Sequence, residues 1–407
     1  MGKYLQIKLG AFFGVYFFGW LVFCAFMPIW FKQILGLSGT QIGTIFALNA
    51  VVCMMTHPAY GIISDRIGQR KSLLYFITAG MFLTGPFMIF VYAPLLAGSF
   101  IVGAVVGAIF LALFFNAGVA AIETFIEKLS RKDGFEFGRV RMWGSLGAAA
   151  GIFVAGKVFN VNPEWIFWLS SASAIVLMLV LICIPADNGR SLPEQGNEIS
   201  IADAMKLFRM RKVWLFMMFI VGSSCVYSVF DQQFGIYYAS LFPTVAEGNE
   251  AFGMLNSFQV FLEAACMGIA PSIVNRIGAK RGLVLAGMIM AFRVTGSGMV
   301  TDTTIISVLK LMHAAELSIL IVSIFKYIAA HFDNRLSSVM YLVGFELSSQ
   351  LGASLISVVA GTLYDWIGFA DSYIVLGGIV LIFTMLGIVV LEPDGYERNE
   401  AYLDKVK

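Results

Sequence analysis

Ionisable side chains lie inside long apolar stretches of this sequence, where a charge is costly and usually serves a function. Lys310, His313 and Glu316 recur at i, i+3 and i+6, and would form a slanting stripe along one side of a helix. Asp231 could neutralise Lys310. Arg293 could approach Glu316 and help to drive off its proton. Such a set suits a proton relay, and the alternative is a group of ion pairs that only lock helices together.

Glu123 and Arg141 form a second candidate pair, in the first half of the chain. A carboxylate accepts hydrogen bonds, and a guanidinium donates several in a fixed fork, so the two could hold the hydroxyls of a sugar. The alternative is a structural ion pair between two neighbouring helices. Glu263 and Glu346 are further acids within apolar stretches, and the sequence alone gives them no partner.

The composition decides what kind of element must position these residues. Of the 407 residues, 59% are hydrophobic and only 13% are charged, too few charges to cover soluble domains and too little polarity for a disordered chain. No basic stripe with interleaved aromatics is present, which excludes a nucleic-acid partner. No zinc spacing, phosphate-binding loop or nucleophile elbow is found. We therefore expect no enzyme, metal or cofactor, and any uphill transport must draw on an ion gradient.

Apolar stretches of roughly 20 residues predict membrane-spanning helices. The sequence has twelve, at about 8–31, 41–63, 73–94, 97–125, 140–158, 165–185, 213–240, 250–274, 281–300, 303–329, 336–362 and 370–391. Lysine and arginine gather in alternate loops, so the positive-inside rule places both termini in the cytoplasm. The predicted class is an all-α polytopic membrane protein.

The chain divides at its longest polar insert, 187–212, into halves 1–186 and 213–407. The second helix of each half runs into a similar turn, ending in Arg70-Lys71 in the first half and in Lys280-Arg281 in the second. The first turn contains Gly61, Asp65, Arg66, Gly68 and Arg70. It resembles the loop signature of the major facilitator superfamily, although a plain cytoplasmic turn is the alternative. A parallel repeat implies two six-helix bundles with the substrate between them, near the membrane midplane.

Five stretches together resemble the oligosaccharide:proton symporters of that superfamily, the lactose, sucrose, raffinose and melibiose permeases of bacteria. The resemblance runs through nearly the whole chain. It is carried by Ile122-Glu-Thr-Phe-Ile-Glu-Lys128, Phe135-Glu-Phe-Gly-Arg-Val-Arg-Met-Trp-Gly144, Val229-Phe-Asp-Gln-Gln233, Leu309-Lys-Leu-Met-His-Ala-Ala-Glu316 and Phe325-Lys-Tyr-Ile328.

The resemblance implies two groups of functional residues and the fold of twelve helices in two bundles. The sugar-recognition group would comprise Glu123, Arg141, Asn116 and Gln350. The proton-coupling group would comprise Glu316, assisted by Arg293 and His313, with Asp231 and Lys310 as a pair.

Departures from the lactose permease pattern bear on the substrate. Lactose permeases carry an acid where this chain has Ser228 and a lysine where it has Ser349. If only one of the two charged residues were present, it would be an unpaired charge in the membrane, so we expect the two to be lost together. The absence of both resembles sucrose permeases. The glutamate that lactose permeases carry at the position of Val260 is also absent. An acid stands instead at Glu263, which we expect to contact sugar.

Two positions do not fit the pattern. Lactose and sucrose permeases place an aromatic ring for sugar stacking where this chain has Ala148, so either another ring substitutes or the site is looser. Trp20 is the candidate ring, and a lipid-facing aromatic is its alternative role. Glu346 has no counterpart in the family. It could pair with Arg293 or Lys310, or contact the sugar.

The resemblance therefore predicts a monomeric, multi-pass protein of the bacterial inner membrane that imports a disaccharide with a proton. Sucrose is the first expectation, and lactose, melibiose or raffinose follow. A sugar sensor that has the fold but does not transport is an alternative from another class, and a proton-driven exporter is a further one.

Overall fold

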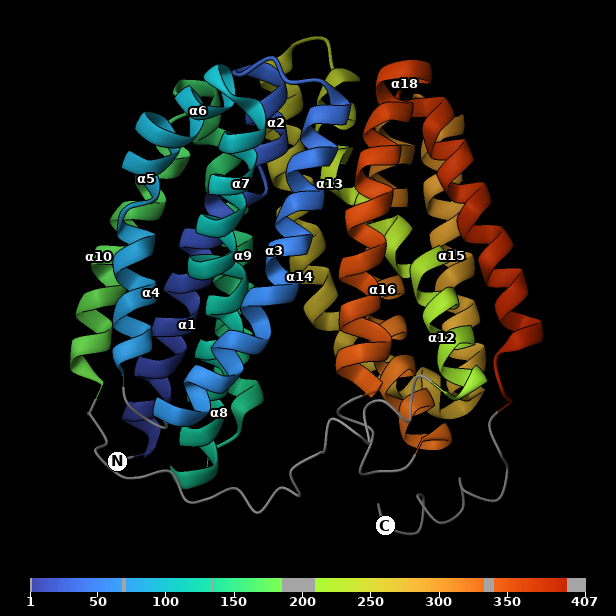
Figure 1. Cartoon of the computed structure of the whole chain (residues 1–407), viewed down its shortest axis with the longest axis horizontal. Coiled ribbons are helices and arrows are strands. Elements are labelled where there is room, and N and C mark those ends of the chain that lie inside the picture. Colours follow the sequence, from blue (N-terminus) through green and yellow to red (C-terminus); the bar gives the residue numbers. More distant parts are fainter. Residues whose placement is uncertain (1, 68–70, 134, 185–208, 333–339, 394–407) are drawn as a thin grey trace. The chain divides into compact units, whose positions relative to one another are not determined.

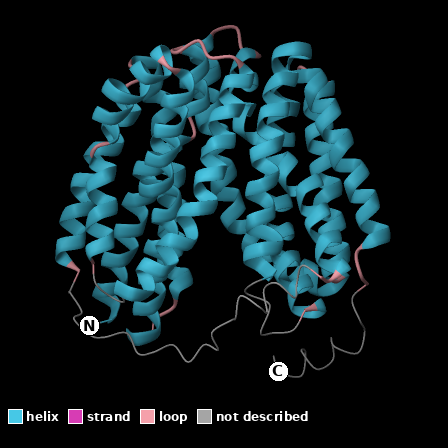
Figure 2. Ribbon diagram, in the orientation of Figure 1, coloured by secondary structure: helices cyan, strands magenta, loops and turns pink. Residues whose placement is uncertain are grey.

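The computed structural model describes residues 2–67, 71–133, 135–184, 209–332 and 340–393. Every regular element within them is a helix, as Figure 2 shows. The α-helices are α1 Gly2–Cys24, α2 Met27–Gln33, α3 Gly39–Ile67, α4 Ser72–Phe82, α5 Thr84–Phe87, α6 Ala93–Gly98, α7 Phe100–Leu111, α8 Ala117–Asp133, α9 Phe137–Val161, α10 Trp165–Cys183, α12 Arg211–Gly222, α13 Ser224–Ser240, α14 Val245–Ile277, α15 Ala279–Met299, α16 Thr303–His331 and α18 Ser348–Val390. Three π-helical segments are η1 Met88–Tyr92, η2 Ala112–Asn116 and η3 Met340–Leu347. The all-α prediction is confirmed.

The described helices are long and apolar enough to cross a membrane at ten places, or at eleven if Ser72–Phe82 and Thr84–Gly98 form one bent span. One candidate, Met340–Val390, has 51 residues, far more than the roughly 20 that one crossing needs. Gly368 lies inside it with a φ of 81°, which breaks the helix, so this stretch supplies two crossings. The described spans are thus consistent with the twelve predicted, and their ends fall within a few residues of the expected ones.

The chain folds into two compact units (Figure 1). Unit 1 comprises Met1–Gln195, Asp231–Phe261 and Ser357–Trp366, and unit 2 comprises Gly196–Phe230, Leu262–Ile356 and Ile367–Lys407. Parts of α13, α14 and α18 therefore belong to unit 1 and parts to unit 2. Most of the expected central loop, 187–208, lies outside the described residues. The division into two six-helix bundles stays a prediction.

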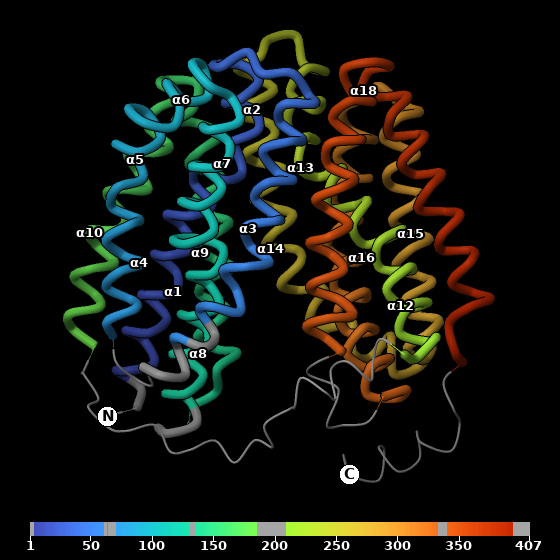
Figure 3. Tube along the Cα trace, in the orientation of Figure 1, coloured from blue at the N-terminus to red at the C-terminus, as the bar shows by residue number. Residues whose placement is uncertain are grey.

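Close backbone contact joins α1 to α9 within unit 1, and Figure 3 shows the two helices side by side. A Cβ added at Gly147 would lie 2.0 Å from the carbonyl oxygen of Gly14. One added at Gly151 would lie 2.7 Å from that of Phe18. Gly147 and Gly151 form a GxxxG pattern, which lets helix backbones approach closely in membranes. This contact fixes α9, which carries Arg141, against the first helix.

The first turn of α3 is held by a carboxylate from α18, also within unit 1. Asp365 accepts hydrogen bonds of 2.7 Å from the backbone amides of Gly39 and Thr40 and from the Thr40 hydroxyl. Free amides at a helix start favour a negative charge, so this contact satisfies donors that no intrahelical carbonyl can reach. It ties together residues more than 300 positions apart.

Unit 2 is built around α15 and α16, which pack along each other. Small side chains allow the approach: a Cβ added at Gly282 of α15 would lie 2.1 Å from the Ser323 hydroxyl of α16. The shared interface buries Arg293 completely, together with Glu316 and nearly all of His313. Because these side chains are charged or polar, the packing requires that they satisfy one another.

Candidate sugar and proton sites

The structure brings Glu123 of α8 and Arg141 of α9 together in unit 1. Arg141 Nε lies 3.2 Å from Glu123 Oε1, and the side chains are 58% and 30% exposed. Because both remain open, the pair contributes little to stability, and each partner has hydrogen-bonding capacity left. The geometry therefore allows a hydroxylated ligand to replace or extend the Glu123–Arg141 bond.

Asn116 and Trp20, two other residues expected at the sugar site, also lie in unit 1 and are half-buried. The Asn116 side-chain amide donates to Asn49 Oδ1 of α3 at 3.3 Å. The Trp20 ring lies 5.6 Å from that of Phe17 and 6.4 Å from that of Tyr16, in an aromatic cluster on α1. Ala148, where the family carries a ring, is buried on α9.

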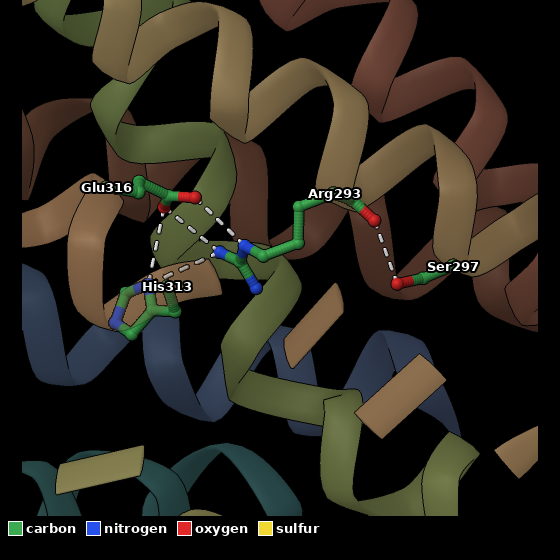
Figure 4. Close-up of polar contacts among 4 residues, drawn as sticks. All are labelled: Arg293, Ser297, His313 and Glu316. Atoms are coloured by element: carbon green, nitrogen blue, oxygen red, sulfur yellow. Dashed lines mark hydrogen bonds and ion pairs between the residues drawn. The ribbon is translucent and has the colours of Figure 1, made fainter. Parts of the chain in front are cut away.

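Arg293, His313 and Glu316 form one buried cluster between α15 and α16, drawn in Figure 4. Arg293 donates to both oxygens of Glu316, from Nε at 2.9 Å and from Nη2 at 3.1 Å. Both side chains are 0% exposed. A bidentate guanidinium–carboxylate pair is the strong form of this interaction, and it keeps a charged carboxylate tolerable inside the membrane.

His313 Nδ1 contacts both other members of the cluster. It lies 3.3 Å from Glu316 Oε1 and 3.4 Å from Arg293 Nη2. With a proton, Nδ1 donates to the carboxylate; without one, it accepts from the guanidinium. One Nδ1 atom cannot donate and accept at once, so the position of the imidazole proton decides whether His313 binds Glu316 or Arg293.

Aromatic rings and a backbone contact complete the cluster. Arg293 lies over the Phe230 ring, 4.9 Å from its centroid, and the rings of Tyr227 and His313 are 5.3 Å apart. The Ser297 hydroxyl donates to the Arg293 carbonyl at 2.8 Å (Figure 4). An apolar, ring-lined surrounding strengthens each electrostatic interaction inside it.

Four other expected site residues lie on the predicted helices. Lys310 is buried on α16, while Asp231 of α13, Glu263 of α14 and Gln350 of α18 are half-buried. Asp231 belongs to unit 1 and lies near Tyr364 of that unit, whereas Lys310 belongs to unit 2. The Asp231–Lys310 pairing and the sugar contacts of Glu263 and Gln350 stay predictions.

The predicted turn motif is described only in part. Gly61, Asp65 and Arg66 fall in the last turns of α3, where only the backbone is described, and Gly68 and Arg70 lie outside the described residues. Lys71 follows and donates to the carbonyls of Leu181, at 2.8 Å, and of Ile184, at the end of α10. Burial lowers the pKa of the Lys71 ammonium from its ordinary value. The residue thus caps a helix, beyond its positive-inside role.

Four hydrogen bonds were not expected from the sequence. Glu346 accepts from the Tyr341 hydroxyl at 3.1 Å, within η3 of unit 2. Tyr16 and Tyr60 donate to backbone carbonyls of η2. A tyrosine inside an apolar stretch gives no signal of its partner. Among the described residues, no group of His, Cys, Asp and Glu could hold a metal ion.

Solved structures with similar folds are membrane transporters. The nucleoside transporter NupG superposes with a TM-score of 0.80 at 12% identity, covering 96% of this chain and 99% of that one. A D-xylose-proton symporter gives 0.68 at 15% identity, covering 96% and 98%. At these identities the likeness concerns the fold alone, and it confirms the expected major facilitator architecture.

Sequence comparison identifies closer relatives. The family model described as LacY proton/sugar symporter matches residues 3–400. The raffinose permease of Escherichia coli is 41% identical over 388 residues, which cover 94% of this chain and 91% of that protein. The sucrose permease of Escherichia coli is 39% identical over 378 residues, covering 93% and 91%. The lactose permease of Citrobacter freundii is 40% identical over 376 residues, covering 91% and 90%.

These relatives are permeases and not enzymes, and they match this chain along nearly its whole length. The apolar spans and the family match both indicate a membrane transporter. The chain is a multi-pass membrane protein of a bacterial permease family, and it belongs to the LacY proton/sugar symporters.

Proposed function

We propose that this protein imports a disaccharide together with a proton across the bacterial inner membrane, and that the disaccharide is sucrose. The observation that carries the proposal is the buried Arg293–His313–Glu316 cluster, because it places a carboxylate and an imidazole, two groups that can exchange a proton, beside a guanidinium and away from water. The raffinose, melibiose and lactose permeases among the relatives make those sugars the alternatives.

Sugar binding is assigned to Glu123 and Arg141, whose open ion pair has donors and acceptors to offer. Ser228 and Ser349 stand where the resemblance to lactose permeases implies an acid and a lysine, and this departure favours sucrose over lactose. Asn116, Gln350, Glu263 and Trp20 are assigned to the wall of the same site. No cofactor takes part, since the proton gradient drives the transport.

The transport cycle follows from the two groups of residues. Sugar binds while Glu316 is protonated and its bonds to Arg293 are weakened, because a neutral carboxyl attracts the guanidinium less. The loaded carrier reorients and releases sugar into the cell. Arg293 then favours the charged carboxylate, so Glu316 gives up its proton to the cytoplasm. We assign both termini to the cytoplasm and a monomer as the working unit.

The test is pH recording in an anaerobic, weakly buffered suspension of cells that express the protein. Sucrose, raffinose, melibiose and lactose are added in separate runs. Alkalinisation of the medium with sucrose supports the proposal, and alkalinisation with another sugar alone changes the substrate. No alkalinisation with any of them, while labelled sugar still binds, would indicate a sensor or an uncoupled carrier. Cells that express Glu316→Gln serve as the control for endogenous proton movement.

A further inference from the structure

The helix that carries Glu123 begins with an irregular segment. In η2 the amide of Ala117 bonds to the carbonyl of Ala112, five residues earlier, whereas an α-helix bonds across four. A π segment holds one more residue in its turn than an α-helix does, and such segments often lie at functional sites. η2 ends at Asn116, and α8 continues from Ala117 to Glu123 and beyond.

Two tyrosines from neighbouring helices bind this segment through its backbone. Tyr16 of α1 donates its hydroxyl to the carbonyls of Phe114, at 3.0 Å, and Phe115, at 2.8 Å. Tyr60 of α3 donates to the carbonyl of Leu113 at 2.7 Å. Both tyrosines are buried, with exposures of 0% and 4%. Three consecutive carbonyls of η2 are therefore held by side chains from two other helices.

The irregular turn determines where the sugar-site residues point. One residue corresponds to about 100° of rotation in an α-helix, so the extra residue of η2 turns everything after it relative to the segment before. Asn116 is the last residue of η2, and Glu123 stands two helical turns later. If η2 relaxed to an α-helix, Glu123 could not keep both its place on α8 and its 3.2 Å contact with Arg141.

We propose that Tyr16 and Tyr60 are positioning residues for sugar binding, whose hydroxyls hold η2 in its π form and thereby aim Asn116 and Glu123. The inference rests on the proposed function, because it takes those two residues as sugar ligands. It adds two specificity-determining side chains that need not touch the sugar. The tyrosines act through the backbone, so their effect depends on the hydroxyl and not on the ring.

The variants Tyr16→Phe and Tyr60→Phe remove each hydroxyl and keep the ring. Tyr92→Phe is the matched control: Tyr92 is also fully buried in unit 1, and its hydroxyl has no hydrogen-bond partner within the described chain. Purified proteins in detergent are titrated with sucrose, raffinose, melibiose and lactose, well below the thermal transition. Hydrogen–deuterium exchange of peptides that cover residues 112–123 is followed in parallel.

We expect each tyrosine variant to weaken sugar binding about three- to tenfold, as the loss of one hydrogen bond predicts, with faster exchange across η2. Tyr92→Phe should change neither. When Asn116 is already replaced by alanine, Tyr16→Phe should weaken sugar binding less, because the Asn116 amide that the tyrosine positions is absent. A merely structural tyrosine would lower the melting temperature and leave the dissociation constant and this coupling unchanged.

Two results would overturn the inference, and they differ from a failure of the proposed function. Unchanged sugar affinity in both tyrosine variants, with a wild-type protein that binds sugar, rejects the positioning role alone. Unchanged exchange across η2 rejects the clamp itself. If the wild-type protein binds none of the four sugars, the proposed function fails, and the positioning role fails with it.

Discussion

At the scale of single residues, Arg293 places a full charge where water does not reach. Its side chain and that of Glu316 are entirely buried, and two hydrogen bonds join them. Such a pair adds little net stability compared with apolar residues, yet the loss of one member leaves the other as an uncompensated charge. The cluster is therefore sensitive to single substitutions and tolerant of matched ones.

We expect Arg293→Ala to lower the free energy of unfolding by about 3–5 kcal/mol, because Glu316 stays buried without its guanidinium partner and keeps only the contact with His313. The double variant Arg293→Ala/Glu316→Gln should recover much of that loss. The melting temperature and denaturant midpoint in detergent measure both. Arg139→Ala removes an exposed pair with Glu136 and should leave the midpoint unchanged. Equal losses in the single and double variants would contradict the role of the buried charge.

Arg141 should behave in the opposite way, because its pair with Glu123 is open to solvent. We expect Arg141→Lys to leave the melting temperature nearly unchanged but to weaken sugar binding at least about tenfold, since an ammonium lacks the planar fork of donors. Isothermal titration with sucrose measures the affinity. A lysine variant with native affinity would place the sugar site elsewhere.

At this scale, the sequence was sufficient to single out residues whose charge or polarity is unusual inside a membrane. Arg293, His313 and Glu316 stand out because each is a polar residue in an apolar stretch, and helical spacing puts the latter two on one side. The hydroxyl contacts of Tyr16 and Tyr60 could not be predicted. They depend on a local helix geometry that no hydropathy pattern encodes.

At the scale of elements, close helix contacts rest on single glycines. A Cβ added at Gly361 of α18 would lie 2.2 Å from the carbonyl oxygen of Gly39, whereas one at Gly378, beyond the break at Gly368, meets nothing within 4 Å. Gly39 begins α3, where the Asp365 carboxylate also binds. The start of α3 is therefore fixed by backbone proximity and by charge together.

We expect Gly361→Ala to destabilise the protein by about 1–3 kcal/mol, because the methyl group must push two backbones apart. Gly378→Ala is its control, in the part of α18 beyond the break at Gly368. That change should be neutral or stabilising by up to about 1 kcal/mol, since alanine favours a helix more than glycine does. Thermal unfolding in detergent compares the two. Equal melting temperatures would show that the contact between α3 and α18 is not close in the folded protein.

Element boundaries were largely predictable, because an apolar run of spanning length has few alternatives. Thr303–His331 was expected as 303–329, and Trp165–Cys183 as 165–185. The π segments η1, η2 and η3 were not predictable, since one extra residue in a turn leaves the apolar pattern intact. Their origin is tertiary: hydroxyls and neighbouring helices hold carbonyls that an α-helix would use itself.

At the scale of the whole molecule, the residues proposed for sugar binding and those proposed for proton coupling lie in separate stretches of chain. Glu123 and Arg141 belong to unit 1, and Arg293, His313 and Glu316 belong to unit 2. Symport requires that sugar binding at one group changes the proton affinity of the other, and the reverse effect must be equally large. A proton on Glu316 that favours sugar binding must itself be held more tightly when sugar is bound.

This separation makes the two functions separable by mutation. Glu316→Gln keeps the carboxyl position neutral, as if protonated, so we expect sugar exchange across membrane vesicles to persist while accumulation driven by a proton gradient is lost. Glu123→Gln should lose both, because its defect lies in sugar binding and precedes any proton movement. Counterflow of labelled sucrose measures exchange, and uptake under an imposed pH gradient measures accumulation, with Tyr92→Phe as the buried control. If Glu316→Gln still concentrates sugar, the proton is carried by another group, and the buried cluster serves only to hold α15 against α16.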